Sequence, residues 1–220
     1  MCSSRTGVFL GIAVALVLIS LPAQGSGGDH ASHAHDGHGQ HGSDYRQDAE
    51  TPTSGGPPYA TKLSAYQTPD VMLLGHDGQE HSLVSLLDSE KPVMLNFIFT
   101  SCTTICPVMT STFREVERQL GPDRERVQMV SISIDPEHDT PARLAKFAQA
   151  RGAGVPWAFL TGDLASIRET QVAFDVYRGN KMNHVPMTFL RVSAERPWLR
   201  IDGFAAASDI VREYRGLTGE

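Results

Sequence analysis

Two cysteines between an apolar run and a helix-like segment constrain this chain more than any other feature. The run covers residues 92–100, and a C-x3-C-P motif follows it as Cys102, Cys106 and Pro107. Apolar residues at helical spacing come next, so we expect both thiols on the turn from a strand into a helix. A helix N-terminus carries partial positive charge and unpaired N–H groups, which lower the pKa of a cysteine. Such a pair can exchange disulfides or bind a soft metal ion.

Residues 1–25 have the pattern of an export signal. Arg5 supplies a positive start, residues 8–21 are apolar, and Ala23 and Gly25 give the small residues that a signal peptidase needs. The apolar stretch is short for a membrane span, which takes about 20 residues, so cleavage is favoured. An uncleaved membrane anchor stays open, because a tether would suit a protein that serves a membrane complex. We therefore expect an exported, periplasmic protein, with anchoring to the inner membrane as the alternative.

Export also bears on the role of the thiols. With Cys2 removed in the signal, Cys102 and Cys106 remain in an oxidising compartment, where a structural disulfide is the usual expectation. A bridge across so short a loop would stabilise the fold only slightly, so a functional role is favoured. The formal net charge of −6 offers no general attraction to nucleic acid, and nucleic-acid binding is dropped as a candidate function.

Residues 26–64 are predicted to be a disordered, histidine-rich linker. Up to residue 58 the segment is rich in Gly, Ser, His and Asp, so it cannot bury enough apolar surface to offset its chain entropy. Five histidines lie within residues 29–41. Imidazoles bind copper, zinc or nickel, and some metal affinity is favoured over a purely solvating role. A metal scavenger carried on a structural domain is therefore one functional hypothesis.

Residues 65–220 are predicted to form one α/β domain. Strand and helix patterns alternate, and a β-hairpin over residues 71–83 precedes them, which indicates a central mixed sheet flanked by helices. Thr140 is the expected N-cap of one helix, with Pro141 at its first position. The other predicted elements are strands over 93–99, 127–134, 157–160, 187–192 and 199–201, and helices over 109–120, 163–174 and 207–214.

Three segments together resemble the Sco/SenC family. They are residues 99–107 with the paired cysteines, residues 130–141 with the sequence V-S-I-S-I-D-P-E-H-D-T-P, and residues 183–190 with N-H-V-P-M-T-F-L. Members of this family are thioredoxin-fold proteins linked to copper delivery and cytochrome c oxidase maturation. The resemblance covers roughly residues 65–217 and implies a thioredoxin-like fold, with the 71–83 hairpin as an N-terminal extension.

The resemblance also implies a copper site made of Cys102, Cys106 and His184. Two thiolates suit Cu(I), and the added imidazole makes Cu(II) tolerable. The implied partners are a copper-receiving oxidase subunit and other copper chaperones or thiol reductases. The chain departs from the family pattern at Thr103, where Pro is common, and at Asn183, where Asp is usual. The second change removes a negative charge that could orient the histidine.

A redox function is the alternative to copper delivery. Residues 184–189 also look like the V-P-x-T-F strand start of thioredoxin-like reductases of the cytochrome c maturation type. In that reading the protein is a thiol–disulfide oxidoreductase that reduces the cysteines of a metalloprotein before metal insertion. Cys102 would be the attacking thiol and Cys106 the resolving one. A chaperone, by contrast, would exchange ligands without catalytic turnover.

Other polar residues near the motifs are expected to have ordinary roles. Asp135 and Asp139 are predicted to cap the following helix and shape its loop rather than bind metal. His138 is predicted to be a solvated loop residue, and Met109 belongs to the apolar stripe of the helix that follows the cysteines.

Overall fold

The computed structural model describes residues 58–155 and 157–219. The predicted export signal and the histidine tract lie outside the described residues. The strands are β1 (Tyr59–Ser64), β2 (Met72–Gly75), β3 (Glu80–Ser82), β4 (Val93–Ile98), β5 (Gln128–Ser133), β6 (Trp157–Thr161), β7 (Met187–Arg191) and β8 (Trp198–Gly203). The helices are α1 (Leu83–Leu87), α2 (Ile105–Leu120), α3 (Pro141–Ala150), α4 (Leu164–Ala173) and α5 (Ala207–Thr218), with 3-10 helices η1 (Gly121–Arg126) and η2 (Lys181–Asn183).

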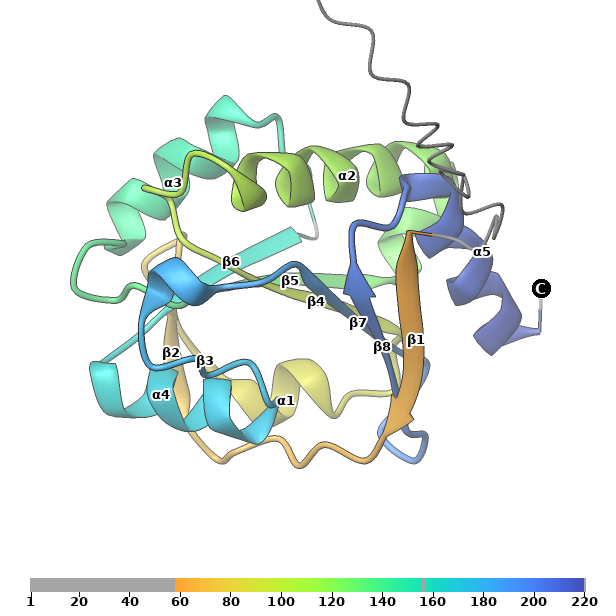
Figure 1. The fold of residues 1–220 in the computed structure, drawn as a ribbon, viewed down its shortest axis with the longest axis horizontal. Helices are drawn as coiled ribbons and strands as arrows, with labels where there is room; N and C mark the ends of the chain where they lie inside the picture. Colours follow the sequence, from red (N-terminus) through yellow and green to blue (C-terminus); the bar gives the residue numbers. More distant parts are fainter. Residues whose placement is uncertain (1–57, 156, 220) are drawn as a thin grey trace, which may run out of the picture. The chain divides into compact units, whose positions relative to one another are not determined.

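The described strands form one mixed sheet in the order β1-β8-β7-β4-β5-β6-β2-β3. β4, β5 and β6 run parallel to one another, whereas β7, β8 and β1 continue the sheet antiparallel on one side. The β2–β3 hairpin extends it antiparallel beyond β6. Helices α2, α3 and α5 pack on one face, and α1 and α4 on the other (Figure 1). The predicted mixed sheet with flanking helices, including the hairpin, is confirmed.

β4 is the interior strand that leads into the cysteine motif. All six of its residues are buried, which fits its nearly continuous apolar sequence between β5 and β7. Successive side chains of a strand point to opposite faces. Met94 and Ile98 accordingly pack in the core beneath α2, whereas Leu95 and Phe97 pack in the core beneath α1 and α4. The loop that follows β4 therefore starts from a strand whose side chains pack in the cores on both faces of the sheet.

Strand β1 corrects the predicted linker boundary. Residues 26–64 were expected to lack structure, yet β1 pairs along its whole length with β8, from Tyr59 opposite Gly203 to Ser64 opposite Trp198. Tyr59 is the one buried residue of this edge strand, so the apolar pattern that marks a strand is missing. The hydrogen bond from the Tyr59 hydroxyl to Glu213 of α5, at 3.1 Å, adds a long-range contact that local sequence does not reveal.

Among the helices that flank the site, α3 begins at Pro141 as predicted, whereas α2 begins at Ile105, ahead of its predicted apolar stripe. In α2 the stripe of Met109, Phe113, Val116 and Leu120 is buried as expected. Thr140 caps α3, because its hydroxyl oxygen accepts a hydrogen bond from the Arg143 N–H at 3.4 Å. Among the described residues, none of the helices is both long enough and apolar enough to cross a membrane.

Candidate thiol and metal site

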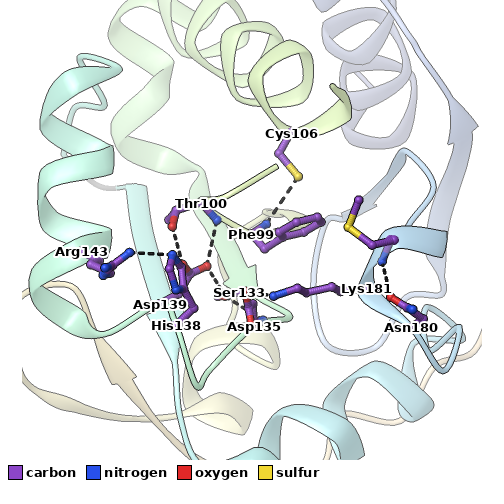
Figure 2. Close-up of polar contacts among 11 residues, drawn as sticks. Phe99, Thr100, Cys106, Ser133, Asp135, His138, Asp139, Arg143, Asn180 and Lys181 are labelled. Carbon is purple, nitrogen blue, oxygen red and sulfur yellow. Dashed lines mark hydrogen bonds and ion pairs between the residues drawn. The ribbon is translucent and has the colours of Figure 1, made fainter. Parts of the chain in front are cut away.

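The two cysteines lie on the turn from β4 into α2, as predicted. Cys102 is half-buried in the loop, Cys106 is buried in the first turn of the helix, and both thiols are free. The Cys106 N–H donates to the Cys102 sulfur at 3.4 Å. The side chain of Thr104, at the N-cap position, makes no capping bond, so the Cys102 sulfur satisfies one of the unpaired N–H groups at the start of α2. The Phe99 N–H donates to the Cys106 sulfur at 3.4 Å (Figure 2).

The two thiols differ in acidity. Burial raises the pKa of Cys102, but hydrogen bonds from the Cys106 and Thr104 N–H groups outweigh it, and the pKa lies below the usual thiol value. Burial raises the pKa of Cys106 to about 12, and the hydrogen bond with Cys102 and the negative charges of Cys102 and Asp139 add to that effect. At neutral pH Cys102 is therefore the nucleophilic thiol, and Cys106 holds its proton.

His184 is held in one tautomer by the backbone of β4. Its side chain is 4% exposed, and its Nε2 lies 2.9 Å from the Phe97 carbonyl oxygen. A carbonyl only accepts, so Nε2 carries the proton and Nδ1 presents a lone pair. Among the described residues Nδ1 has no hydrogen-bond partner, although it is buried. Burial lowers the pKa of His184, which keeps the ring neutral and able to bind a metal ion.

The cysteine pair and His184 attach to neighbouring points of one strand end. Cys106 accepts from the Phe99 N–H, and His184 donates to the Phe97 carbonyl, two residues earlier. The Phe99 ring packs edge-on against the His184 imidazole, with ring centroids 6.3 Å apart. Within residues 58–155 and 157–219, no three His, Cys, Asp or Glu side chains are grouped closely enough to hold a metal ion. The structure thus joins the two cysteines and leaves His184 apart from them.

Asp139 connects the cysteine loop to the β5–α3 loop. Its fully buried carboxylate accepts from the Thr100 N–H at 2.9 Å, from the Thr100 hydroxyl, and from the Ser133 hydroxyl at 2.6 Å (Figure 2). The expectation that Asp139 caps the following helix is wrong, because Thr140 makes that cap. The Asp139 partner Thr100 lies 39 positions earlier in the chain, and nothing in the local sequence indicates this contact.

Asp135 and His138 occupy the rest of the same loop. Asp135 is buried and pairs with Lys181 of η2, which ties the loop to the segment that precedes His184 (Figure 2). Asp135 therefore shapes the loop, as expected, without capping α3. His138 accepts a hydrogen bond from Arg143 at 2.6 Å in an exposed position, so it belongs to the surface.

A pocket of about 740 Å³ opens beside His184. Residues of α4, the segment 176–181 and Ile134 line it, and the described lining includes His184 but neither cysteine. This pocket could not be predicted from the sequence, because its walls come from segments that the fold brings together. It offers access to the imidazole from the face of the sheet that carries α4.

Comparison with known proteins shows which family this chain resembles. The family model for SCO1/SenC matches residues 65–218. A SCO1 protein homolog of Bacillus subtilis is 37% identical over 102 residues, which cover 44% of this chain and 50% of that protein. A SCO2 homolog from mouse mitochondria is 35% identical over 92 residues, which cover 41% of this chain and 35% of that protein. The aligned part of the chain thus spans half or less of the length of these curated relatives.

Solved structures resemble the whole folded part of the chain. BsSco, described as a member of the Sco family of cytochrome c oxidase assembly proteins with a disulfide switch, is 27% identical with a TM-score of 0.59; the match covers 70% of this chain and 94% of that one. ScoI of Bradyrhizobium japonicum, solved with copper bound, is 23% identical with a TM-score of 0.56. The match covers 70% of this chain and 99% of that one, and at this identity it is evidence for the fold only. The thioredoxin-like fold is thereby confirmed. With the family model matched from residue 65 to residue 218, the chain belongs to the SCO1/SenC family.

Proposed function

We propose that this protein is a copper chaperone that holds one copper ion through Cys102, Cys106 and His184 and passes it to a respiratory oxidase. The observation that carries the proposal is the buried, unpartnered Nδ1 of His184. A histidine that binds a metal through one nitrogen typically donates its other N–H to a carbonyl or carboxylate. The Nε2–H bond to the Phe97 carbonyl has that form.

The donor set fits copper as cargo. Two sulfurs and one imidazole nitrogen suit Cu(I), and a low coordination number leaves room for a ligand from the receiving protein. The Cys102 sulfur already accepts from the Cys106 N–H, and the Phe99 ring packs against the His184 imidazole. Loading would therefore close the loop onto the imidazole, and release would reopen it. This is ligand exchange, and the recipient in the proposal is a copper-receiving subunit of cytochrome c oxidase.

The place of action in this proposal is outside the cytoplasmic membrane. The signal pattern of residues 1–25 supports export to the periplasm, with a tether to the inner membrane as the alternative. Other copper chaperones or thiol reductases would supply the metal or keep the thiols reduced there. The likeness to BsSco, an assembly protein with a disulfide switch, supports a role for the redox state of the thiols.

A thiol–disulfide oxidoreductase is the second candidate, and the unequal acidity of the two thiols favours it. Cys102 has a lowered pKa and partial exposure, as an attacking thiol needs. Cys106 is buried with its pKa raised to about 12, as expected for a resolving thiol that waits for a mixed disulfide. Under this candidate, Cys106→Ser accumulates a mixed disulfide between Cys102 and a partner cysteine, and failure to trap that adduct counts against it.

Copper binding by the reduced chain tests the leading proposal. A protein that lacks residues 29–42 removes competition from the histidine tract, and anaerobic Cu(I) titration against a chelator gives stoichiometry and affinity. We expect one Cu(I) per chain, loss of binding in Cys102→Ala, and at least about tenfold weaker binding in His184→Ala. His138→Ala, a surface histidine, is the matched control and leaves affinity unchanged. Absence of stoichiometric binding, or equal affinity in His184→Ala, refutes the proposed site.

A further inference from the structure

We infer that Asp139 is a positioning residue for the thiol pair, holding the β4–α2 loop so that Cys102 and Cys106 stay in contact. The inference rests on the proposed use of the thiols, for either copper or disulfide exchange. Asp139 touches neither sulfur through a hydrogen bond and acts through Thr100, the second residue before Cys102.

The first step concerns the hydrogen bonds that hold the loop. The Phe99 N–H binds the Cys106 sulfur, and the Phe99 carbonyl accepts from the Cys102 N–H at 3.2 Å. Both contacts join residues of the segment 99–106, whose Phe99 and Cys106 side chains are buried in the core beneath α2. Thr100 carries the contact that fixes the loop to a distant part of the chain, through both its N–H and its hydroxyl. The position of Cys102 relative to the helix therefore depends on this attachment as well as on the bond from the Cys106 N–H.

The second step is that Asp139 is itself held rigidly. Its carboxylate is fully buried, and the Ser133 hydroxyl of β5 donates to the oxygen that also accepts from the Thr100 N–H. Its backbone N–H donates to the Asp135 carbonyl at 2.8 Å. Because three donors bind this one buried carboxylate, it is a fixed point rather than a mobile contact.

The third step is that helix capping does not explain this carboxylate. Thr140 supplies the cap of α3, and Asp135, four residues earlier, pairs with Lys181. The Asp139 side chain instead crosses from the β5–α3 loop to the cysteine loop, as Figure 2 shows. Asp135 and Asp139 thus share a loop and a charge but differ in what they hold, which makes Asp135 a matched control.

The expected consequence is a loss of effective concentration between the two thiols. Asp139→Ala removes the acceptor of Thr100, so the loop samples more conformations. Two thiols that are not held in position bind a metal ion or form a disulfide less readily. We expect the equilibrium constant for closing the Cys102–Cys106 disulfide to fall at least about tenfold, which corresponds to about 30 mV. Cu(I) affinity should fall by a similar factor.

Equilibration with glutathione tests this without copper. Glutathione disulfide takes two electrons from the dithiol, the two thiols lose their protons as the Cys102–Cys106 bond forms, and two molecules of reduced glutathione result. The full-length reduced protein is incubated in mixtures of reduced and oxidised glutathione and quantified by mass after acid quench. Because this readout involves no metal, it stays informative if the protein fails to bind Cu(I).

The variants separate positioning from charge and from general stability. Asp139→Asn keeps an oxygen acceptor for Thr100 and should stay within about threefold of the wild type. Asp135→Asn should leave the equilibrium unchanged. If Asp139→Ala does not fold, Thr100→Val, which removes the hydroxyl bonded to the carboxylate, should show part of the shift. An unchanged equilibrium in folded Asp139→Ala, equal damage in Asp139→Asn, or no effect of Thr100→Val overturns the inference.

Discussion

Alkylation of the reduced protein should modify Cys102 long before Cys106. The pKa of Cys106 is raised to about 12, whereas that of Cys102 lies below the usual value of 9.0. At about pH 8 the thiolate fraction of Cys106 is then about 10⁻⁴, and that of Cys102 is at least about 10⁻¹. A more basic thiolate is intrinsically more nucleophilic, with a slope of about 0.4–0.5 per pKa unit, which recovers roughly 15- to 30-fold. The difference in thiolate fraction is larger than this gain in nucleophilicity, so Cys102 should react at least about 30-fold faster than Cys106.

The assay is a time course with iodoacetamide, followed by peptide mass spectrometry of both positions. The rate at Cys102 should persist to lower pH than that of an ordinary thiol, because its lowered pKa keeps the thiolate populated there. Guanidinium chloride should bring the two rates within about threefold, since unfolding removes the burial and the hydrogen bonds that separate them. Rates within threefold of each other in the folded protein, or faster reaction at Cys106, refute the assigned roles.

Three further outcomes follow from the structure. Because folding raises the pKa of Cys106 from 9.0 to about 12, its contribution to stability is present below about pH 9 and is lost as the pH rises toward 12. Urea unfolding of the reduced protein at about pH 8 and about pH 10.5 should show this fall, and Cys106→Ala should lessen it. Thr140→Ala removes the cap of α3 and should cost about 1 kcal/mol of unfolding free energy, again by urea, with Thr103→Ala unchanged. Deleting residues 29–42 should lower the copper bound per chain while the Cu(I) bound by the thiol site remains; unchanged stoichiometry would exclude the histidine tract as a metal site.

Most elements of the fold could be predicted because their signals are local. β4 is apolar at nearly every position, the stripe from Met109 to Leu120 has helical spacing, and Thr140 precedes Pro141 as a cap should. β1 could not be predicted in this way. Its residues are mostly exposed, and it is a strand because β8 provides a backbone edge to pair with, which depends on the whole sheet being formed.

In the candidate site too, the residues with local sequence signals could be predicted, whereas their distant or main-chain partners could not. The cysteines and His184 could be named from their motifs, since side-chain type and spacing carry that information. The groups that hold them could not, because several are main-chain atoms: the Phe97 carbonyl for His184 and the Phe99 N–H for Cys106. The role of Asp139 was missed for a related reason, since its partner Thr100 lies 39 residues away in the sequence.

The backbone contact at His184 also changes how the departure at Asn183 should be read. A carboxylate before the histidine would help to orient the ring, and this chain has an amide there instead. In the structure Asn183 is exposed at the end of η2, while the Phe97 carbonyl already fixes the ring by accepting from Nε2. The orientation of Nδ1 therefore does not depend on the charge of residue 183. Under the proposed copper-chaperone function, a carboxylate at this position would raise the basicity of the imidazole and hold a copper ion more firmly, so its replacement by an amide would favour release.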